Sequence, residues 1–564
     1  MEALDWLVIG VFFLALIGII VWVVRQKQND SADYFLGGRD ATWLAIGASI
    51  FASNIGSEHL IGLAGAGASS GMAMAHWEIQ GWMILILGWV FVPFYTRSMV
   101  YTMPEFLERR YNPQSRTILS VISLVSYVLT KVAVTVYAGG LVFQQVFGIK
   151  ELWGIDFFWI AAIGLVVLTA LYTIFGGMKS VLYTSVLQTP ILLLGSLIIL
   201  VLGFKELGGW DEMMRVCGAV TVNDYGDTMT NLIRSNDDAN FPWLGALIGS
   251  AIIGFWYWCT DQFIVQRVLS GKNEKEARRG TIFGAYLKLL PVFLFLIPGM
   301  IAFALHQKYI GAGGEGFLPM LANGTANADA AFPTLVAKLL PAGVKGLVVC
   351  GILAALMSSL ASLFNSSAML FTIDFYKRFR PETPEKKLVG IGQVATVVIV
   401  ILGILWIPIM RSVGDVLYTY LQDVQSVLAP GIAAAFLLGV CWKRTSAQGG
   451  MWGLISGMVI GLTRLGAKVY YSNAGEVADS TFKYLFYDMN WLFFCGWMFL
   501  FCMIVVIVVS LTTKAPTAEK IQGLVFGTAT KEQKAATRVS WDHWDIIHTV
   551  IILSITAAFY WYFW

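Results

Sequence analysis

Residues 47–59 read Gly-Ala-Ser-Ile-Phe-Ala-Ser-Asn-Ile-Gly-Ser-Glu-His, inside a longer apolar stretch that covers 41–69. Small and polar residues dominate this segment, and its middle contains few strong helix formers. We therefore predict a membrane helix that unwinds near Asn54 to Gly56. A broken helix exposes backbone carbonyls that can bind a cation, and it is tolerated only beside a cavity. The alternative is an intact helix whose small residues form a packing stripe.

The chain around this segment has the composition of a polytopic membrane protein. Of its 564 residues, 57% are hydrophobic and only 13% are charged, more apolar surface than soluble cores can bury. Apolar runs near the required length of about 20 residues recur from end to end, without the alternation typical of barrel strands. We expect an all-α fold of about 14 transmembrane helices. Their approximate limits are 5–25, 41–69, 71–98, 117–147, 153–175, 179–204, 242–270, 280–306, 334–376, 388–410, 413–440, 447–471, 487–512 and 544–563.

Basic residues are concentrated in alternate loops. The loops that follow odd-numbered spans hold roughly 25 of the lysines and arginines against about ten in the others, so the positive-inside rule makes them cytoplasmic. The main groups are Arg25 and Lys27, Arg109 and Arg110, Lys272 to Arg279, Lys377 to Lys387, Lys443 and Arg444, and Lys514 to Arg538. Both termini are then expected on the extracytoplasmic side of the plasma membrane.

Other classes of protein are excluded by what the sequence lacks. The net charge is only +3, and no basic stretch is interleaved with aromatics, so nucleic-acid binding is not indicated. Five of the six cysteines lie in apolar spans, which leaves no disulfide framework or zinc spacing. No nucleophile is paired with a base, and no P-loop follows the last span. We therefore expect no enzymatic activity, organic cofactor or obligatory protein partner, and any uphill transport would draw on an ion gradient.

Glu78, just after His76-Trp77, and Lys288, within Tyr-Leu-Lys-Leu-Leu-Pro at 286–291, are ionisable residues inside neighbouring predicted spans. Charges are costly in hydrocarbon, so intramembrane ionisable residues are functional candidates. An acid and a base on neighbouring spans can simply neutralise one another. Beside a wet cavity, the same pair suits hydroxyl recognition, with the acid as acceptor and the ammonium as donor.

Three aromatic residues stand directly before polar ones in Trp-Tyr-Trp-Cys-Thr-Asp-Gln at 256–262. Aromatic faces stack on the C–H faces of sugars, while carboxylates, amides and amines bind the hydroxyl edge. Aromatic residues make up 14% of the chain, and most of them are expected to face lipid or the membrane interface. The segment is thus a candidate for one wall of a carbohydrate pocket.

Ala355, Ser358 and Ser359 have the i, i+3 and i+4 spacing of one helical face. Two hydroxyls together with carbonyls from a broken helix form a neutral, all-oxygen site that suits a hard monovalent cation. Serines in membrane helices also pack against neighbours or bond back to the preceding turn. Both interpretations stay open on these residues alone.

Taken together, these segments resemble the sodium/glucose cotransporters (SGLT-type) of the solute:sodium symporter family. The matching stretches are SNIGSEHLIGLAGAGASSG at 53–71, MPEFLERRY at 103–111, ALYTIFGGM at 170–178, WYWCTDQFIVQRVLS at 256–270, YLKLLP at 286–291 and ALMSSLASLFNSS at 355–367. The resemblance implies a LeuT-like core of ten helices in two inverted five-helix repeats, each with a broken first helix, here the spans containing Asn54 and Tyr257. It divides the chain into a peripheral helix and linker (1–40), repeat 1 (41–204), an outer loop (205–240), repeat 2 with an outer loop at 307–333 (241–445) and peripheral helices (446–564).

The resemblance also implies site residues and a function. Its sugar-binding positions fall on Asn54, His59, Trp77, Glu78, Tyr257, Trp258, Lys288 and Gln422, and its common sodium site falls on Ala52, Ile55, Ala355, Ser358 and Ser359. The expected activity is Na⁺-driven symport of a hexose such as glucose or galactose by alternating access. Alternatives are symport of myo-inositol, a sialic acid or an amino acid, or a membrane sugar sensor that does not transport.

Three positions depart from the family pattern. Ser185 replaces an acid that resembles a second-sodium ligand, and Ala361 lacks the hydroxyl of two-sodium members, so one Na⁺ per sugar is predicted. Gly254 has no side chain where some sugar transporters have a polar one. The animal proteins have extracellular disulfides that this chain cannot form, which favours a bacterial inner membrane.

Overall fold

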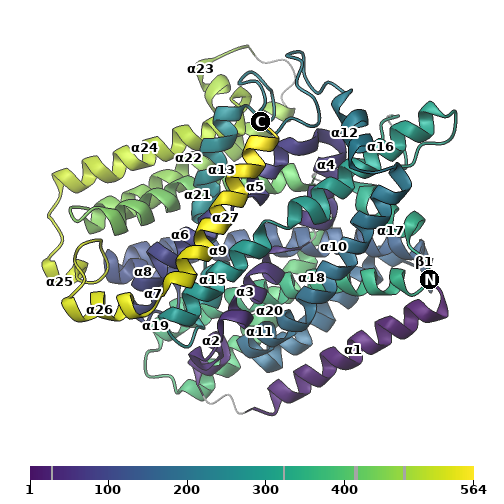
Figure 1. Ribbon diagram of the computed structural model, residues 1–564. Coiled ribbons are helices and arrows are strands. Elements are labelled where there is room, and N and C mark those ends of the chain that lie inside the picture. Colours follow the sequence, from purple (N-terminus) through teal and green to yellow (C-terminus); the bar gives the residue numbers. More distant parts are fainter. Residues whose placement is uncertain (27–29, 57, 322–323, 412–416, 474–477) are drawn as a thin grey trace.

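The computed structural model is almost entirely helical (Figure 1). It describes residues 1–26, 30–56, 58–321, 324–411, 417–473 and 478–564, and part of predicted span 413–440 lies outside these ranges. The α-helices are α1 (Ala3–Val24), α2 (Ser31–Leu36), α3 (Trp43–Asn54), α4 (Ala64–Ser70), α5 (Ala75–Glu78), α6 (Gly81–Ile86), α7 (Val92–Ser98), α8 (Met103–Arg110), α9 (Pro113–Ser126), α10 (Ala133–Phe147), α11 (Phe157–Leu207), α12 (Trp210–Gly218), α13 (Trp243–Gly254), α14 (Gln262–Leu269), α15 (Glu274–Lys288), α16 (Ile297–Gly311), α17 (Ala331–Leu339), α18 (Val344–Met369), α19 (Lys377–Phe379), α20 (Glu385–Arg411), α21 (Leu417–Cys441), α22 (Ala447–Asn473), α23 (Thr481–Lys483), α24 (Trp491–Thr512), α25 (Ala518–Ile521), α26 (Lys531–Val539) and α27 (His543–Tyr562). A two-residue hairpin, β1 (Glu151–Leu152) with β2 (Ile155–Asp156), pairs antiparallel.

The predicted break in the first core helix is present. α3 ends at Asn54, Ile55 is extended (φ −80°, ψ 107°), and a π-helical turn, η2 (Glu58–Leu63), carries the chain on into α4. The last helical hydrogen bond of α3 runs from the Ile55 amide to the Phe51 carbonyl, at 3.0 Å. The last carbonyls of such a helix lack donors from a following turn and stay available for other partners.

A second break interrupts the span that contains Tyr257. The π-helical turn η6 (Phe255–Thr260) follows α13, Asp261 is extended (φ −75°, ψ 128°), and α14 begins at Gln262. The Asp261 side chain caps α14 by accepting from the Phe263 amide at 3.3 Å. Both breaks lie inside the bundle, because α3 packs against α11, α15 and α18 while η6 packs against α21.

The predicted spans 153–175 and 179–204 both lie in α11, which consists of two helices that meet at a kink between the two spans. Gly177 kinks it, with φ +53° and ψ −147°, and a side chain there would lie 2.4 Å from the Tyr34 carbonyl oxygen. Ten helices of the described chain are long and apolar enough to cross a membrane. The number of 14 spans is therefore not confirmed and stays a prediction.

The loops rich in basic residues gather on one face of the bundle. Arg110 on α8 donates to the carbonyl of Gly439, in the last turn of α21, at 2.7 Å and to that of Thr445, just after α21, at 3.1 Å. Arg279 on α15 pairs with Asp542 before α27 at 2.6 Å. Figure 1 shows α2, α8, α19, α25 and α26 on this same side of the molecule.

The long loops and both chain ends lie on the opposite face. The Leu232 amide, in the loop before α13, donates to the Phe563 carbonyl at 3.1 Å. At the other terminus, the Asp5 carboxylate accepts from the Gly343 amide at 2.7 Å, just before α18. The basic loops and the two termini are thus separated by the thickness of the bundle, as the charge distribution predicts.

Candidate substrate pocket and cation site

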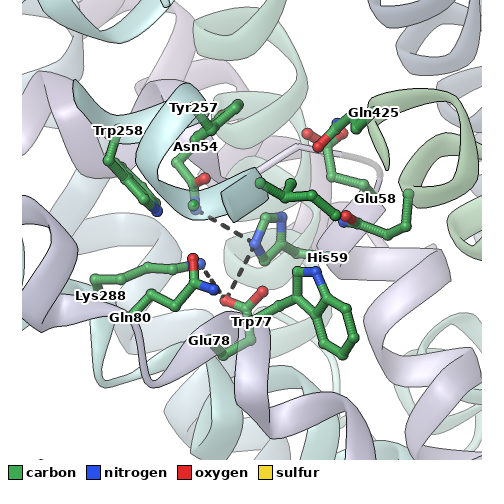
Figure 2. A pocket seen from close by; sticks show the side chains of 13 residues that line it. Asn54, Glu58, His59, Trp77, Glu78, Gln80, Tyr257, Trp258, Lys288 and Gln425 are labelled. Carbon is green, nitrogen blue, oxygen red and sulfur yellow. Dashed lines mark hydrogen bonds and ion pairs between the residues drawn. The ribbon is translucent and has the colours of Figure 1, made fainter. Parts of the chain in front are cut away.

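A polar pocket with a cavity volume of about 50 Å³ lies where the two broken helices meet (Figure 2). All eight residues predicted to bind substrate line it. The full lining is Asn54, Glu58, His59, Trp77, Glu78, Gln80, Ile253, Gly254, Tyr257, Trp258, Lys288, Gln422 and Gln425. The structure thus brings together residues that lie up to 371 positions apart in the sequence.

A buried ion pair crosses the floor of this pocket. Lys288, at the end of α15, donates to Glu78 Oε2 at 2.5 Å, and His59 Nε2 lies 3.3 Å from the same oxygen. Glu78 and Lys288 are 1% and 3% exposed, so each compensates the charge of the other in a region that excludes water. Lys288 also lies 5.3 Å from the ring centroid of Trp258.

The ion pair leaves hydrogen-bonding capacity facing the cavity. Asn54 Nδ2 also lies 3.3 Å from His59 Nε2, and one imidazole nitrogen cannot donate to Glu78 and accept from Asn54 together. Among the described residues, His59 Nδ1, Trp77 Nε1 and Gln422 Oε1 are buried without a hydrogen-bond partner. Buried polar atoms are normally satisfied, so these donors and acceptors indicate a polar ligand.

Trp77 separates the pocket from the face that carries the termini. Its ring stacks on Trp491 at the start of α24, with centroids 5.5 Å apart, and meets the edge of Phe241 at 6.1 Å. Only 5% of Trp77 is exposed. The peripheral helix α24 therefore helps to hold this outer wall in place.

Tyr257 separates the pocket from the basic face. Its ring lies 5.0 Å from Trp258 and 6.2 Å from Phe263. On its far side Lys131 pairs with Asp261 at 2.6 Å, with the ammonium 4.8 Å from the Tyr257 ring centroid. A molecule that leaves the pocket toward the basic face would require the Tyr257 ring and the ion pair of Lys131 and Asp261 to move.

Sequence reasoning missed Glu58, Gln80 and Gln425 as pocket residues. Gln425 follows Gln422 at the i+3 spacing of one helical face, a signal that could have identified it. Gln80 could be found only from the structure: its amide donates to the Ser250 carbonyl at 2.8 Å. A side-chain carbon at Gly254 would lie 2.5 Å from Gln80 Oε1, so Gln80 fills the space that Gly254 leaves.

The five residues predicted to bind sodium come from the ends of the α3 break and from α18. Ala52, Ile55, Ala355, Ser358 and Ser359 are all at least 98% buried. A side-chain carbon added to Gly56 would lie 3.1 Å from Ser359 Oγ. The Ser359 hydroxyl therefore lies against the break in the first core helix. Next to it, the hydroxyls of Ser53 and Ser362 join α3 to α18 at 2.6 Å. Carbonyl and hydroxyl oxygens are the donors that unwound helices offer to Na⁺.

Ser185, the position that departs from the two-sodium pattern, lies beside this site. Its hydroxyl donates to the Val181 carbonyl at 2.6 Å, and Ser358 Oγ is 3.3 Å away. Because the Ser185 proton points to Val181, Ser358 is the donor between the two hydroxyls. Ser185 adds a neutral neighbour to the site and no negative charge.

Comparison with protein families gives one model that covers most of the chain. The model is described as the sodium:solute symporter family and matches residues 34–457. The matched region includes both helix breaks, the pocket and the candidate cation site.

Two similar curated proteins are transporters. The chain is 36% identical to human sodium/myo-inositol cotransporter 2 over 542 residues, which cover 94% of this chain and 79% of that protein. It is also 36% identical to sodium/glucose cotransporter 4 of Danio rerio over 537 residues, covering 92% and 80%.

A solved structure shares the fold. A Na⁺-coupled sialic acid symporter in a substrate-bound outward-open state matches with a TM-score of 0.72 and 22% identity, covering 92% of this chain and 99% of that one. This likeness confirms the expected LeuT-like, all-α membrane fold.

Proposed function

Because this chain belongs to the sodium:solute symporter family and is therefore a multi-pass Na⁺-coupled transporter rather than an enzyme, we propose that its solute is a neutral polyhydroxylated ring. A hexose such as glucose or galactose is the first candidate. The observation that carries the proposal is the buried polar pocket in which Glu78, Lys288 and His59 present acceptors and donors beside Trp258. A ring with hydroxyls on its edge and C–H groups on its faces complements such a site.

The second candidate is myo-inositol, a neutral ring with a hydroxyl on every carbon. It is favoured by the likeness to human sodium/myo-inositol cotransporter 2. Carboxylated solutes such as sialic acids and amino acids fit less well, because Lys288 is already paired with Glu78 and the pocket offers no further cation among its described lining residues.

Na⁺ would bind at the α3 break, through the carbonyls of Ala52, Ile55 and Ala355 and the hydroxyls of Ser358 and Ser359. A ligand shifts a conformational equilibrium only through its different affinities for the two states. Bridging α3 and α18 by one ion would favour the state in which these helices lie together. The neutral Ser185 beside Ser358 supports one Na⁺ for each solute molecule.

Solute would then be bound by Asn54, Glu78, Lys288 and Gln422, with Tyr257 as the gate toward the basic face. We place that face in the cytoplasm of the cell, with both termini outside, in agreement with the charge asymmetry of the loops. A bacterial inner membrane remains our proposal for the location. Alternating access would open the Trp77 wall and the Tyr257 wall in turn.

The test is uptake of labelled myo-inositol, glucose, galactose and sialic acid into proteoliposomes with an inward Na⁺ or K⁺ gradient. We expect Na⁺-dependent uptake of at least one of the neutral rings, and none after Ser359→Ala. Binding of a ring without flux would instead identify a sensor. Uptake of sialic acid alone would contradict the proposed solute class.

A further inference from the structure

Glu58 is an acidic pocket residue that forms no ion pair with any other described residue. It begins η2, directly after the break in the first core helix, and its partly exposed side chain lines the cavity. The pocket contains two carboxylates, Glu58 and Glu78, but one lysine, and Lys288 is bound to Glu78 at 2.5 Å. Within the described part of the chain, no basic group lies within ion-pair distance of Glu58.

The Glu58 carboxylate points toward the candidate cation site. A side-chain carbon on Gly56 would lie 2.8 Å from Glu58 Oε2 and 3.1 Å from Ser359 Oγ. The two oxygens thus approach the same point and lie within about 6 Å of each other. Figure 2 shows Glu58 beside Gln425, at the opposite end of the pocket from the pair of Glu78 and Lys288.

The candidate cation site itself carries no negative charge, since its ligands are three carbonyls and two hydroxyls. A bound Na⁺ would add one positive charge within a few ångströms of the uncompensated carboxylate. We propose that Glu58 provides the counter-charge for the transported Na⁺ and sets its affinity through space, without coordinating the ion. This inference rests on the proposed cation site and adds a residue to it.

The same charge links the cation to the solute. Without Na⁺, the pocket holds an uncompensated carboxylate that requires water, and a neutral solute that displaces this water loses binding energy. With Na⁺ bound, the carboxylate is balanced and the solute enters at a lower cost. Coupling between two ligands is reciprocal, so Na⁺ and solute raise each other's affinity. Glu58 is therefore a positioning and coupling residue.

The test is a Na⁺ titration of the purified full chain without solute, at ionic strength held constant with choline chloride. Intrinsic fluorescence of the 21 tryptophans reports binding. Unit charges about 6 Å apart at an effective dielectric constant near 20 attract strongly enough to change affinity on the order of 10- to 100-fold. We expect Glu58→Gln to raise the half-saturating Na⁺ concentration at least about tenfold and Glu58→Asp to stay within about threefold of wild type.

A second titration measures coupling, as the ratio of solute affinities with and without Na⁺. We expect this ratio to fall toward one in Glu58→Gln. Glu315→Gln, which removes an exposed acid from the outer loop, is the matched control and should behave as wild type. If Glu58→Gln does not elute as a folded monodisperse protein, Glu58→Gly serves in its place, since it removes the same charge.

A half-saturating Na⁺ concentration in Glu58→Gln that stays within twofold of the wild-type value would overturn the role of Glu58. The first titration contains no solute, so it remains decisive if the solute is not a ring polyol. Normal Na⁺ titrations together with no uptake of any ring would refute the proposed solute and leave the role of Glu58 standing.

Discussion

In the proposed function the buried pair of Glu78 and Lys288 would have two roles, since each charge compensates the other inside the protein and both would present polar atoms to the solute. Lys288→Met removes the ammonium and leaves Glu78 buried without compensation. Breaking such a pair costs about 3 to 5 kcal/mol, and we expect this loss in the free energy of unfolding. Thermal unfolding of the purified variant, together with uptake, measures both roles.

The matched variant replaces both charges, as Glu78→Gln with Lys288→Met. Replacing a buried pair by neutral residues of similar size is often tolerated, so most of the stability should return. Uptake should not return, because the ionic groups proposed to bind the solute are gone. Equal stability of the single and double variants would contradict this account of the pair.

Gly254 is required by the side chain of Gln80, which occupies the space beside it. In Gly254→Ala the new carbon would displace Gln80 from its hydrogen bond to the Ser250 carbonyl. Losing one positioned amide is worth about 1 to 2 kcal/mol, so KM for solute should rise about 5- to 30-fold with little change in maximal rate. Gly164→Ala on α11 is the control, since nothing lies within 4 Å of the added carbon. An unchanged KM in Gly254→Ala would show that Gln80 does not position solute.

Residue type and spacing predicted the part of the pocket that carries strong polar chemistry. Glu78 and Lys288 stood out because ionisable groups are costly inside apolar spans. Gln80 did not stand out, because a glutamine near a helix end is common in proteins. Its place in the pocket depends on its hydrogen bond to the Ser250 carbonyl on α13. Glu58 was not singled out from the sequence, and its proposed role depends on how near its carboxylate lies to Ser359, which only the structure shows.

At the scale of elements, the outer loop 307–333 packs directly on the first broken helix. Asp329 Oδ1 lies 2.5 Å from the position of a side-chain carbon on Gly65 in α4. Burial of this carboxyl raises its pKa from 3.8 to about 6. The folded protein therefore holds the proton more tightly than the unfolded chain, and the stabilisation is complete below about pH 4 and lost as the pH rises through about 6.

Asp329→Asn should remove this dependence. At pH 7.5 we expect the variant to be more stable than wild type by about 1 to 3 kcal/mol, since each pKa unit corresponds to about 1.4 kcal/mol. At pH 4 the two proteins should unfold alike. Thermal unfolding at four pH values between 4 and 7.5 measures the effect, with Glu315→Gln as the exposed control. A constant difference at every pH would assign it to packing rather than to ionisation.

The helix breaks were predictable because the local sequence disfavours a continuous helix. The run of small and polar residues before His59 placed the first break correctly. The second break falls at Asp261, four residues after Tyr257, where an aspartate caps a new helix. The division of α11 was predictable from the glycine pair at 176–177, whereas the close packing of Gly177 against Tyr34 at this kink was not.

At the scale of the whole molecule, the energy available to transport depends on how many ions accompany each solute molecule. One Na⁺ moving down about 100 mV gains about 2.3 kcal/mol, and a tenfold gradient adds about 1.4 kcal/mol. The sum, about 3.7 kcal/mol, permits solute accumulation on the order of 500-fold. The neutral surroundings of the candidate cation site, with Ser185 beside Ser358, are consistent with this single-ion limit.

The most direct test of the central claim is the ratio of ²²Na⁺ flux to labelled solute flux in the same proteoliposomes at a clamped membrane potential. One ion is expected for each solute molecule, with both fluxes lost in Ser359→Ala. A ratio near two, or solute flux that continues unchanged when K⁺ replaces Na⁺, would contradict the assignment of a single Na⁺ site at the α3 break.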